Sequence, residues 1–120
     1  IYKEQTELTT FDKKQLDIVR DYNYLVETNF KTKKQVADYA EMLNKSPKTL
    51  SNLFKKYNEK SPLQIIQDRT ILEARRLLRH SDQSIKEIAY EIGYEDIQSF
   101  SRFFKKLEGV SPSEFKKNAE

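Results

Sequence analysis

Apolar residues recur at spacings of three and four along most of the chain, which is the periodicity of amphipathic helices. Strict apolar–polar alternation, the pattern of a half-buried strand, is sustained nowhere. The pattern therefore predicts an all-α fold of about seven helices. Residues that commonly cap helices place the starts of these helices near Asp12, Thr32, Ser46, Ser61, Ser84, Asp96 and Ser111.

The residue types at the helix ends set the expected boundaries. Asp12 is predicted to cap the first helix, with Gln15 in its first turn. Thr32 and Gln35 have the spacing of a capping box, which predicts the start of the second helix. Asn44 is predicted to end this helix in the left-handed conformation.

One stretch of the sequence recurs about fifty residues later in the chain. Residues 49–66 and 99–116 are identical at six of 18 positions, including a Phe-Lys-Lys run and a Ser-Pro pair. Asn44 matches Gly93 at an offset of 49, so the second copy is expected to have one extra residue in its turn. The repeated unit is predicted to be a helix-turn-helix followed by a Ser-Pro helix.

The repeat predicts four segments. Residues 1–11 have no clear period and are expected to be a linker or tail, and the initial Ile indicates a piece of a longer protein. Residues 12–60 form the first helix-turn-helix subdomain, residues 61–80 a long linking helix, and residues 81–120 the second subdomain. The part of this helix from Leu63 to Arg79 spans about 25 Å at roughly 1.5 Å per residue. It would suit two recognition helices that enter successive major grooves about 34 Å apart.

The second helix of each predicted unit has one apolar face and one polar face. Leu50, Leu53, Phe54 and Tyr57 cluster on a helical wheel in the first copy, and Phe100, Phe103, Phe104 and Leu107 cluster in the second. The candidate base-reading residues lie opposite or beside these clusters: Lys48, Thr49, Ser51 and Asn52, then Gln98, Ser99, Ser101 and Arg102. The candidate phosphate-binding residues are Lys55, Lys56, Lys105 and Lys106.

These residue types fit the chemistry of a DNA groove. Arginine can bond two acceptors of guanine, and asparagine or glutamine can pair with adenine. Lysines at the far end of the helix suit phosphates, which position a protein without reading sequence. Neither polar face has an acidic residue between its cap and its lysine pair, although the chain has 19 acids. A solvated helix face would explain any one of these residues, but the repetition at matching wheel positions favours DNA binding.

Charge differs between the two copies, while the net charge of the whole chain is only +3. Residues 32–60 contain seven lysines and three acids, which gives +4. Residues 84–120 contain six basic and seven acidic residues, which gives −1. The first unit is therefore expected to carry more of the salt-dependent attraction to phosphates.

Other function classes receive less support. The chain has no cysteine, one histidine (His80) and no glycine-rich phosphate loop, so neither an enzyme nor a bound cofactor or metal is expected. No apolar run approaches the roughly 18 residues that span a membrane. A helical protein-interaction module is the main alternative, with Tyr2, Tyr24 and Tyr90 as candidate exposed contacts. RNA binding is a third possibility, without the aromatic stacking sheet that often serves it.

The segment "SIKEIAYEIGYEDIQSFSRFFKKLEGVSPSEFKK", residues 84–117, resembles the signature of AraC/XylS-type bacterial transcription regulators. The preceding segment is similar to the first helix-turn-helix and linking helix of that family. The resemblance implies a seven-helix DNA-binding domain with double-stranded DNA as its partner. It also implies RNA polymerase and an N-terminal sensing or dimerisation region as partners, and a location on the nucleoid in the bacterial cytoplasm.

The chain departs from the family pattern at the end of the first recognition helix. Glu59 stands where the family usually has glycine, a residue that Gly109 supplies in the second copy. Asn58 is a candidate for the left-handed residue there. Tyr94 replaces a more common phenylalanine.

Overall fold

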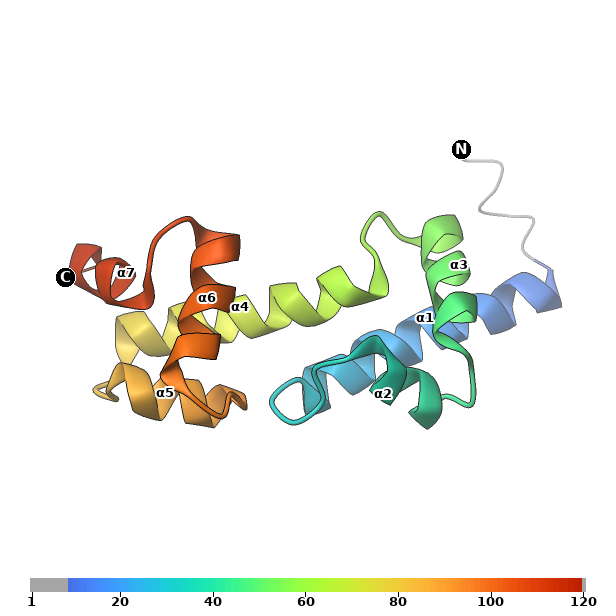
Figure 1. The fold of residues 1–120 in the computed structure, drawn as a ribbon. Coiled ribbons are helices and arrows are strands. Elements are labelled where there is room, and N and C mark those ends of the chain that lie inside the picture. The colour runs from blue at the N-terminus through green and yellow to red at the C-terminus, as the bar shows by residue number, and fades with distance from the viewer. Residues whose placement is uncertain (1–8, 120) are drawn as a thin grey trace. The chain divides into compact units, whose positions relative to one another are not determined.

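The computed structural model describes residues 9–119, and these residues contain seven helices and no strand (Figure 1). The predicted all-α fold is therefore confirmed for this part of the chain. The helices are α1 (Thr10–Asn29), α2 (Val36–Met42), α3 (Pro47–Tyr57), α4 (Pro62–His80), α5 (Ile85–Ile92), α6 (Ile97–Glu108) and α7 (Pro112–Asn118).

The described residues divide into two compact units. Unit 1 consists of residues up to 29 and residues 33–66, and unit 2 consists of residues 30–32 and 67 onward. The first turn of α4 belongs to unit 1 and the rest of this helix to unit 2. Each unit contains one helix-turn-helix pair, α2–α3 or α5–α6.

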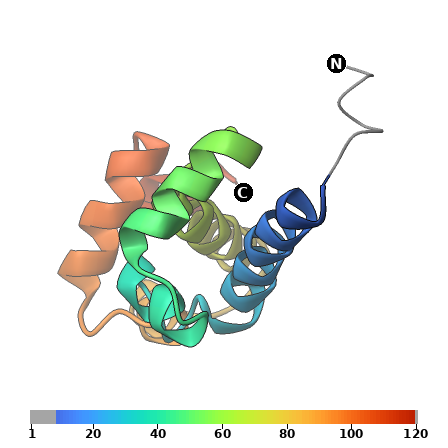
Figure 2. The same cartoon turned by 90° about the vertical axis from the view of Figure 1, so that its right-hand side faces the viewer.

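Unit 1 is organised around Tyr22 of α1, whose side chain is fully buried. Its ring lies 5.0 Å from the ring of Phe54 on α3 and 5.3 Å from that of Tyr39 on α2. Its hydroxyl donates a hydrogen bond of 2.8 Å to the carbonyl oxygen of Pro62, so the buried polar group is satisfied. Burial raises the pKa of Tyr22. The three helices α1, α2 and α3 pack against one another around this residue (Figure 2).

Unit 2 has an aromatic core on α6. Phe100 and Phe104 are fully buried, and Phe104 meets the ring of Phe115 on α7 edge-on at 5.3 Å. Aliphatic side chains of α4 and α5 complete the core: Ile71, Ala74, Leu77, Leu78, Ile88, Ala89 and Ile92. The apolar face of α6 therefore fixes this helix on the core, and its opposite face remains for solvent or a partner.

A buried carboxylate joins three basic side chains in unit 2. The side chain of Glu73 on α4 is 8% exposed, and its Oε2 accepts a hydrogen bond of 2.6 Å from Nη2 of Arg76. Arg69 lies at 3.7 Å and Lys31 at 3.9 Å from the same carboxylate. The Arg76 hydrogen bond, followed by the nearby positive charges, lowers the pKa of Glu73. This cluster holds the 30–32 segment on α4.

The predicted caps at the later helix starts are confirmed. The Ser46 hydroxyl accepts from the backbone N–H of Thr49 at 3.1 Å. Ser84 and Ser111 form capping boxes with Glu87 and Glu114. Pro47, Pro62 and Pro112 each occupy the first residue of a helix, where the missing N–H leaves no hydrogen bond unmade.

The predicted starts of the first two helices are wrong by a few residues. Thr9 caps α1, because its hydroxyl accepts from the N–H of Asp12 at 3.0 Å and the Asp12 carboxylate accepts from the N–H of Thr9 at 3.3 Å. Asp12 therefore lies in the first turn, and two residues expected in the tail are helical. Gln35 rather than Thr32 precedes α2. At α1, Thr9 and Asp12 are both capping residues, and residue type alone does not choose between them. At α2, the backbone N–H of Gln35 donates to the Asp38 carboxylate at 3.3 Å, which places the helix start at a residue type that rarely caps helices.

Candidate nucleic-acid interface

The first helix of each helix-turn-helix pair ends at a left-handed residue. Asn44 has a φ of 56° and Gly93 a φ of 105°, so both adopt the predicted left-handed conformation. The N–H of the residue after each donates to a carbonyl five residues back, that of Ala40 or Ala89, at 2.9 Å. A left-handed residue followed by such a backbone hydrogen bond is a common way to end a helix and turn the chain sharply.

The second turn has one more residue than the first, as the repeat predicts. The left-handed residues Asn44 and Gly93 are 49 positions apart. The N-caps of the next helices, Ser46 and Asp96, are 50 positions apart. The added residue lies between the left-handed position and the cap.

The exposed face of α3 is the predicted one. Its apolar members Leu50, Leu53 and Phe54 are buried, and Tyr57 is half-buried. Lys48, Thr49, Asn52 and Lys55 are exposed on the opposite side, and Ser51 is half-buried. The packing of α3 on α1 and α2 therefore decides which of its side chains face outward.

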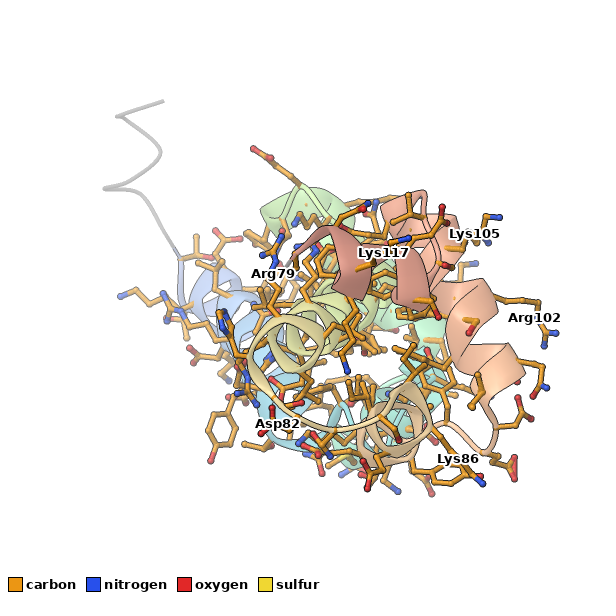
Figure 3. The ribbon with its side chains drawn as sticks, turned by 90° about the vertical axis from the view of Figure 1, so that its left-hand side faces the viewer. Arg79, Asp82, Lys86, Arg102, Lys105 and Lys117 are labelled. Carbon is orange, nitrogen blue, oxygen red and sulfur yellow. The ribbon has the colours of Figure 1, made fainter. Side chains whose placement is uncertain are left out.

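The exposed face of α6 also matches the prediction, with one difference. Gln98, Arg102, Lys105 and Lys106 are exposed, and Ser99 and Ser101 are half-buried. Figure 3 shows Arg102 and Lys105 projecting outward from α6. Leu107, which the wheel assigns to the apolar cluster, is 40% exposed because it lies at the end of the helix, beyond the aromatic core.

Most of the candidate side chains have no competing partner within residues 9–119. No hydrogen bond or ion pair to another described residue engages the side chains of Lys48, Asn52, Lys55, Gln98, Arg102 and Lys105. Thr49 differs, because its hydroxyl oxygen accepts from that of Ser46 at 3.0 Å. The acid-free faces therefore present unpaired donors, as a surface for an anionic partner requires.

Asp96 precedes α6 and caps it. Its carboxylate accepts from the N–H of Ser99 at 2.7 Å. This hydrogen bond is the main cause of the lowered pKa of Asp96, and the charge of Arg102 adds to it. Asp96 is therefore a structural carboxylate at the helix start.

Lys56 has a different environment from the other predicted phosphate ligands. Its Nζ donates to Oε1 of Gln15 at 3.2 Å and lies 3.6 Å from Oδ1 of Asp12, both on α1. The ammonium group also lies 5.1 Å from the centre of the Tyr57 ring. The sequence predicts the same role for Lys55 and Lys56, but the fold turns Lys56 toward α1.

The two recognition helices end differently. Gly109 follows α6 with a φ of 90°, in the left-handed region. Asn58 follows α3 with a φ of −147° and a ψ of 154°, so the suggested left-handed Asn58 is wrong. Glu59 has no positive φ either. The Asn58 side chain instead accepts from the N–H of Lys60 at 3.2 Å, which stabilises an extended exit that needs no glycine.

Sequence reasoning missed the contacts that hold the outer ends of α3 and α6. The Tyr57 hydroxyl reaches Asp12 and Gln15, more than 40 residues earlier in the chain. Arg75 of α4 binds Glu108 of α6 at 2.9 Å. No local spacing reports such distant pairs.

Tyr24 and Tyr90 are exposed as expected, and Tyr2 lies outside the described residues. Residues 9–119 contain no group of three His, Cys, Asp or Glu side chains placed to hold a metal ion. None of the helices in this range combines the length and apolar character needed to cross a membrane.

Two helix-turn-helix units, each with a polar, acid-free face on its second helix, define a tandem helix-turn-helix DNA-binding domain. A family of helix-turn-helix domains matches residues 39–118. The C-terminal domain of AraT, a response regulator from Geobacillus stearothermophilus, is 31% identical and superposes with a TM-score of 0.78, covering 84% of both chains. The chain belongs to the AraC-type helix-turn-helix family, the DNA-binding domains of bacterial transcription regulators. Its binding partner is double-stranded DNA, and the family is not one of enzymes.

Two further relatives extend the comparison. The arabinose operon regulatory protein of Escherichia coli (strain K12) is 35% identical over 98 residues, which are 82% of this chain and 32% of that protein. The chain thus spans about a third of the length of this curated relative. The DNA-binding domain of AdpA, a global transcriptional factor solved in complex with a target DNA, is 24% identical with a TM-score of 0.69 over 87% of this chain and 90% of that one. This last similarity shows the shared fold.

Proposed function

We propose that this domain reads two successive major-groove segments on one face of DNA, with α3 in one segment and α6 in the next. The supporting observation is the pair of exposed, acid-free faces on the second helices of two matching units. Each face carries donors of the kinds that bond base edges. The proposed base-reading residues are Lys48, Thr49, Ser51 and Asn52 on α3, and Gln98, Ser99, Ser101 and Arg102 on α6.

In such a complex, α4 is the spacer between the two recognition helices α3 and α6. This helix is continuous over its 19 residues and is about 28 Å long at 1.5 Å per residue. Successive major grooves on one face of DNA are about 34 Å apart. Two readers in one chain would recognise a direct, asymmetric site with two boxes about one helical turn apart. The DNA-binding domain of AdpA, which shares the fold, was solved in complex with a target DNA.

Phosphate contacts supply the sequence-independent part of the proposed affinity. Lys55, Lys105 and Lys106 are exposed at the ends of the two reading faces, and Lys56 was grouped with them from sequence. Three or four such contacts predict a slope of log affinity against log salt of about −2.7 to −3.6. The affinity would then fall about 40- to 150-fold between about 50 and 200 mM salt.

The wider partners follow from the family. RNA polymerase and an N-terminal sensing or dimerisation region are the proposed protein partners, and the bacterial nucleoid in the cytoplasm is the proposed location. Tyr24 and Tyr90, which are 67% and 50% exposed, are candidates for such protein contacts. If the domain were instead a protein-interaction module without DNA readout, these residues would carry its main activity.

Selection of bound duplexes from random DNA, followed by fluorescence anisotropy, tests the proposal. The chain should enrich a site with two boxes and bind it much more tightly than a scrambled duplex of equal length. Affinity for both duplexes should fall steeply with salt. Absence of enrichment together with a flat salt response would refute DNA reading and favour the protein-interaction alternative.

A further inference from the structure

The outer end of α3 is fastened to α1 by a cluster of polar side chains. The Tyr57 hydroxyl lies 2.9 Å from Oδ1 of Asp12 and 2.7 Å from Oε1 of Gln15. Lys56 Nζ lies 3.2 Å from the same Gln15 oxygen and 3.6 Å from the Asp12 oxygen. Both acceptors belong to the first two turns of α1. We call these four residues the α3 clamp.

The Asp12 carboxylate is also held by Thr9, at the start of its own helix. Its second carboxylate oxygen, Oδ2, accepts from the N–H of Thr9 at 3.3 Å and from the Thr9 hydroxyl at 3.0 Å. The capping interaction at the start of α1 therefore orients the carboxylate that receives Tyr57. Hydrogen bonds from Tyr57 and Thr9 lower the pKa of Asp12, so this acceptor stays ionised. A pre-oriented acceptor sets the position of its donor more closely than a mobile one.

The end of α6 is held in a comparable way by a different pair. Nε and Nη2 of Arg75 on α4 both lie 2.9 Å from Oε1 of Glu108. Glu108 is the last residue of α6, where a negative charge opposes the helix dipole. The Arg75 charge offsets that effect. We call this pair the α6 clamp.

The two clamps are not copies of one another. At the offset of fifty residues between the two copies, Tyr57 aligns with Leu107 and Asn58 with Glu108. The α3 clamp places its acid on the supporting helix, whereas the α6 clamp places its acid on the recognition helix. The C-terminal ends of α3 and α6 are thus held by different sets of residues, which indicates that both helices need a fixed end.

We infer that the two clamps position the recognition helices, and that Lys56 serves the α3 clamp rather than a DNA phosphate. This inference rests on the proposed DNA reading. A bidentate hydrogen bond to a base edge forms only when the helix lies within about 0.5 Å of the required position. A helix that is free to tilt at one end therefore discriminates less well between bases. Contacts to phosphates tolerate such tilting better, because long lysine side chains can follow the backbone.

Tyr57→Phe tests the α3 clamp, because it removes only a hydroxyl. Affinity for the selected duplex should fall about fivefold, while affinity for the scrambled duplex and the salt slope stay unchanged. Tyr24→Phe is the matched control, since that tyrosine lies on α1, the helix that supports α3, and is 67% exposed. Partial unfolding would lower the affinities for the selected and the scrambled duplex by the same factor. The ratio of these two affinities therefore separates an effect on helix position from an effect on stability. An unchanged ratio overturns the inference.

Lys56→Gln and Lys55→Gln form the second comparison. Lys55→Gln should reduce the salt slope by about 0.9, whereas Lys56→Gln should leave it unchanged and lower only the specificity ratio. Equal slope changes would make Lys56 a phosphate ligand and overturn its inferred role, while the proposed DNA reading would stand. A wild-type chain with neither sequence preference nor salt dependence would instead refute the proposed function itself.

Arg75→Gln tests the α6 clamp with a position-dependent readout. Preference should relax at the base pairs of the box that α6 reads and stay intact in the other box. Arg75→Lys keeps the charge and should restore part of the preference. Equal relaxation of both boxes, or no rescue by lysine, would remove the α6 clamp from the inference.

Discussion

Arg102→Ala separates base reading from simple charge attraction. Arg102 is exposed on α6, and its side chain makes no hydrogen bond or ion pair with another described residue. Its removal should therefore change the free energy of unfolding by less than about 0.5 kcal/mol. A bidentate contact to guanine discriminates by about 1–3 kcal/mol, so specific affinity should fall about 5- to 150-fold.

The assay for Arg102→Ala is an anisotropy titration with the selected duplex and with single-base variants of it. The wild-type chain should reject a changed base pair at one position, and the variant should accept all four base pairs there. Lys105→Ala is the matched control, since it should weaken binding to every duplex and lower the salt slope by about 0.9. If Arg102→Ala weakened selected and scrambled duplexes by the same factor, Arg102 would be only a phosphate contact and the assigned reading face of α6 would be wrong.

Three further predictions concern stability. Gly109→Ala should cost about 1–2 kcal/mol in chemical denaturation, because a Cβ there meets nothing within 4 Å and only the left-handed backbone opposes it; no loss would show that this turn relaxes freely. Glu73→Gln should cost about 2 kcal/mol at neutral pH. Because the pKa of Glu73 is lowered, this difference should shrink as pH falls below about 4.3, and a difference that persists in acid would contradict the charged pairing. Burial lowers the pKa of Lys34 to about 8, so the unfolded chain holds more protons above that pH and stability should rise from pH 8 toward 9.5. Lys34→Met should abolish that rise, and an equal rise in the variant would assign it to other groups.

Local signals predicted most of the fold because they depend on neighbouring residues. The Ser-Pro starts, the capping boxes of Ser84 and Ser111, and the left-handed Asn44 all act within one helical turn. The wheel likewise placed Asn52 and Arg102 outward, since each helix has one strongly apolar side. Where two capping residues compete within a few positions, as at the start of α1, local signals are ambiguous.

The supporting contacts of the recognition helices could not be predicted in the same way. Tyr57 and Asp12 are 45 residues apart, and Arg75 and Glu108 are 33 apart. Such pairs depend on how helices cross, and crossing is decided by core packing. Lys55 and Lys56 are adjacent in the sequence and were predicted to have the same role. Adjacent residues on a helix point about 100° apart, so the two side chains have different surroundings, which the sequence alone does not define.

The unlike exits of α3 and α6 affect how this fold can be recognised in other sequences. The exit at Gly109 tolerates few side chains, whereas the extended exit at Asn58 admits many. A pattern search anchored on that glycine would find the second half of such a domain and overlook the first. Domains of this architecture whose first helix-turn-helix unit lacks the glycine would then be counted as having one such unit, although their chains contain two.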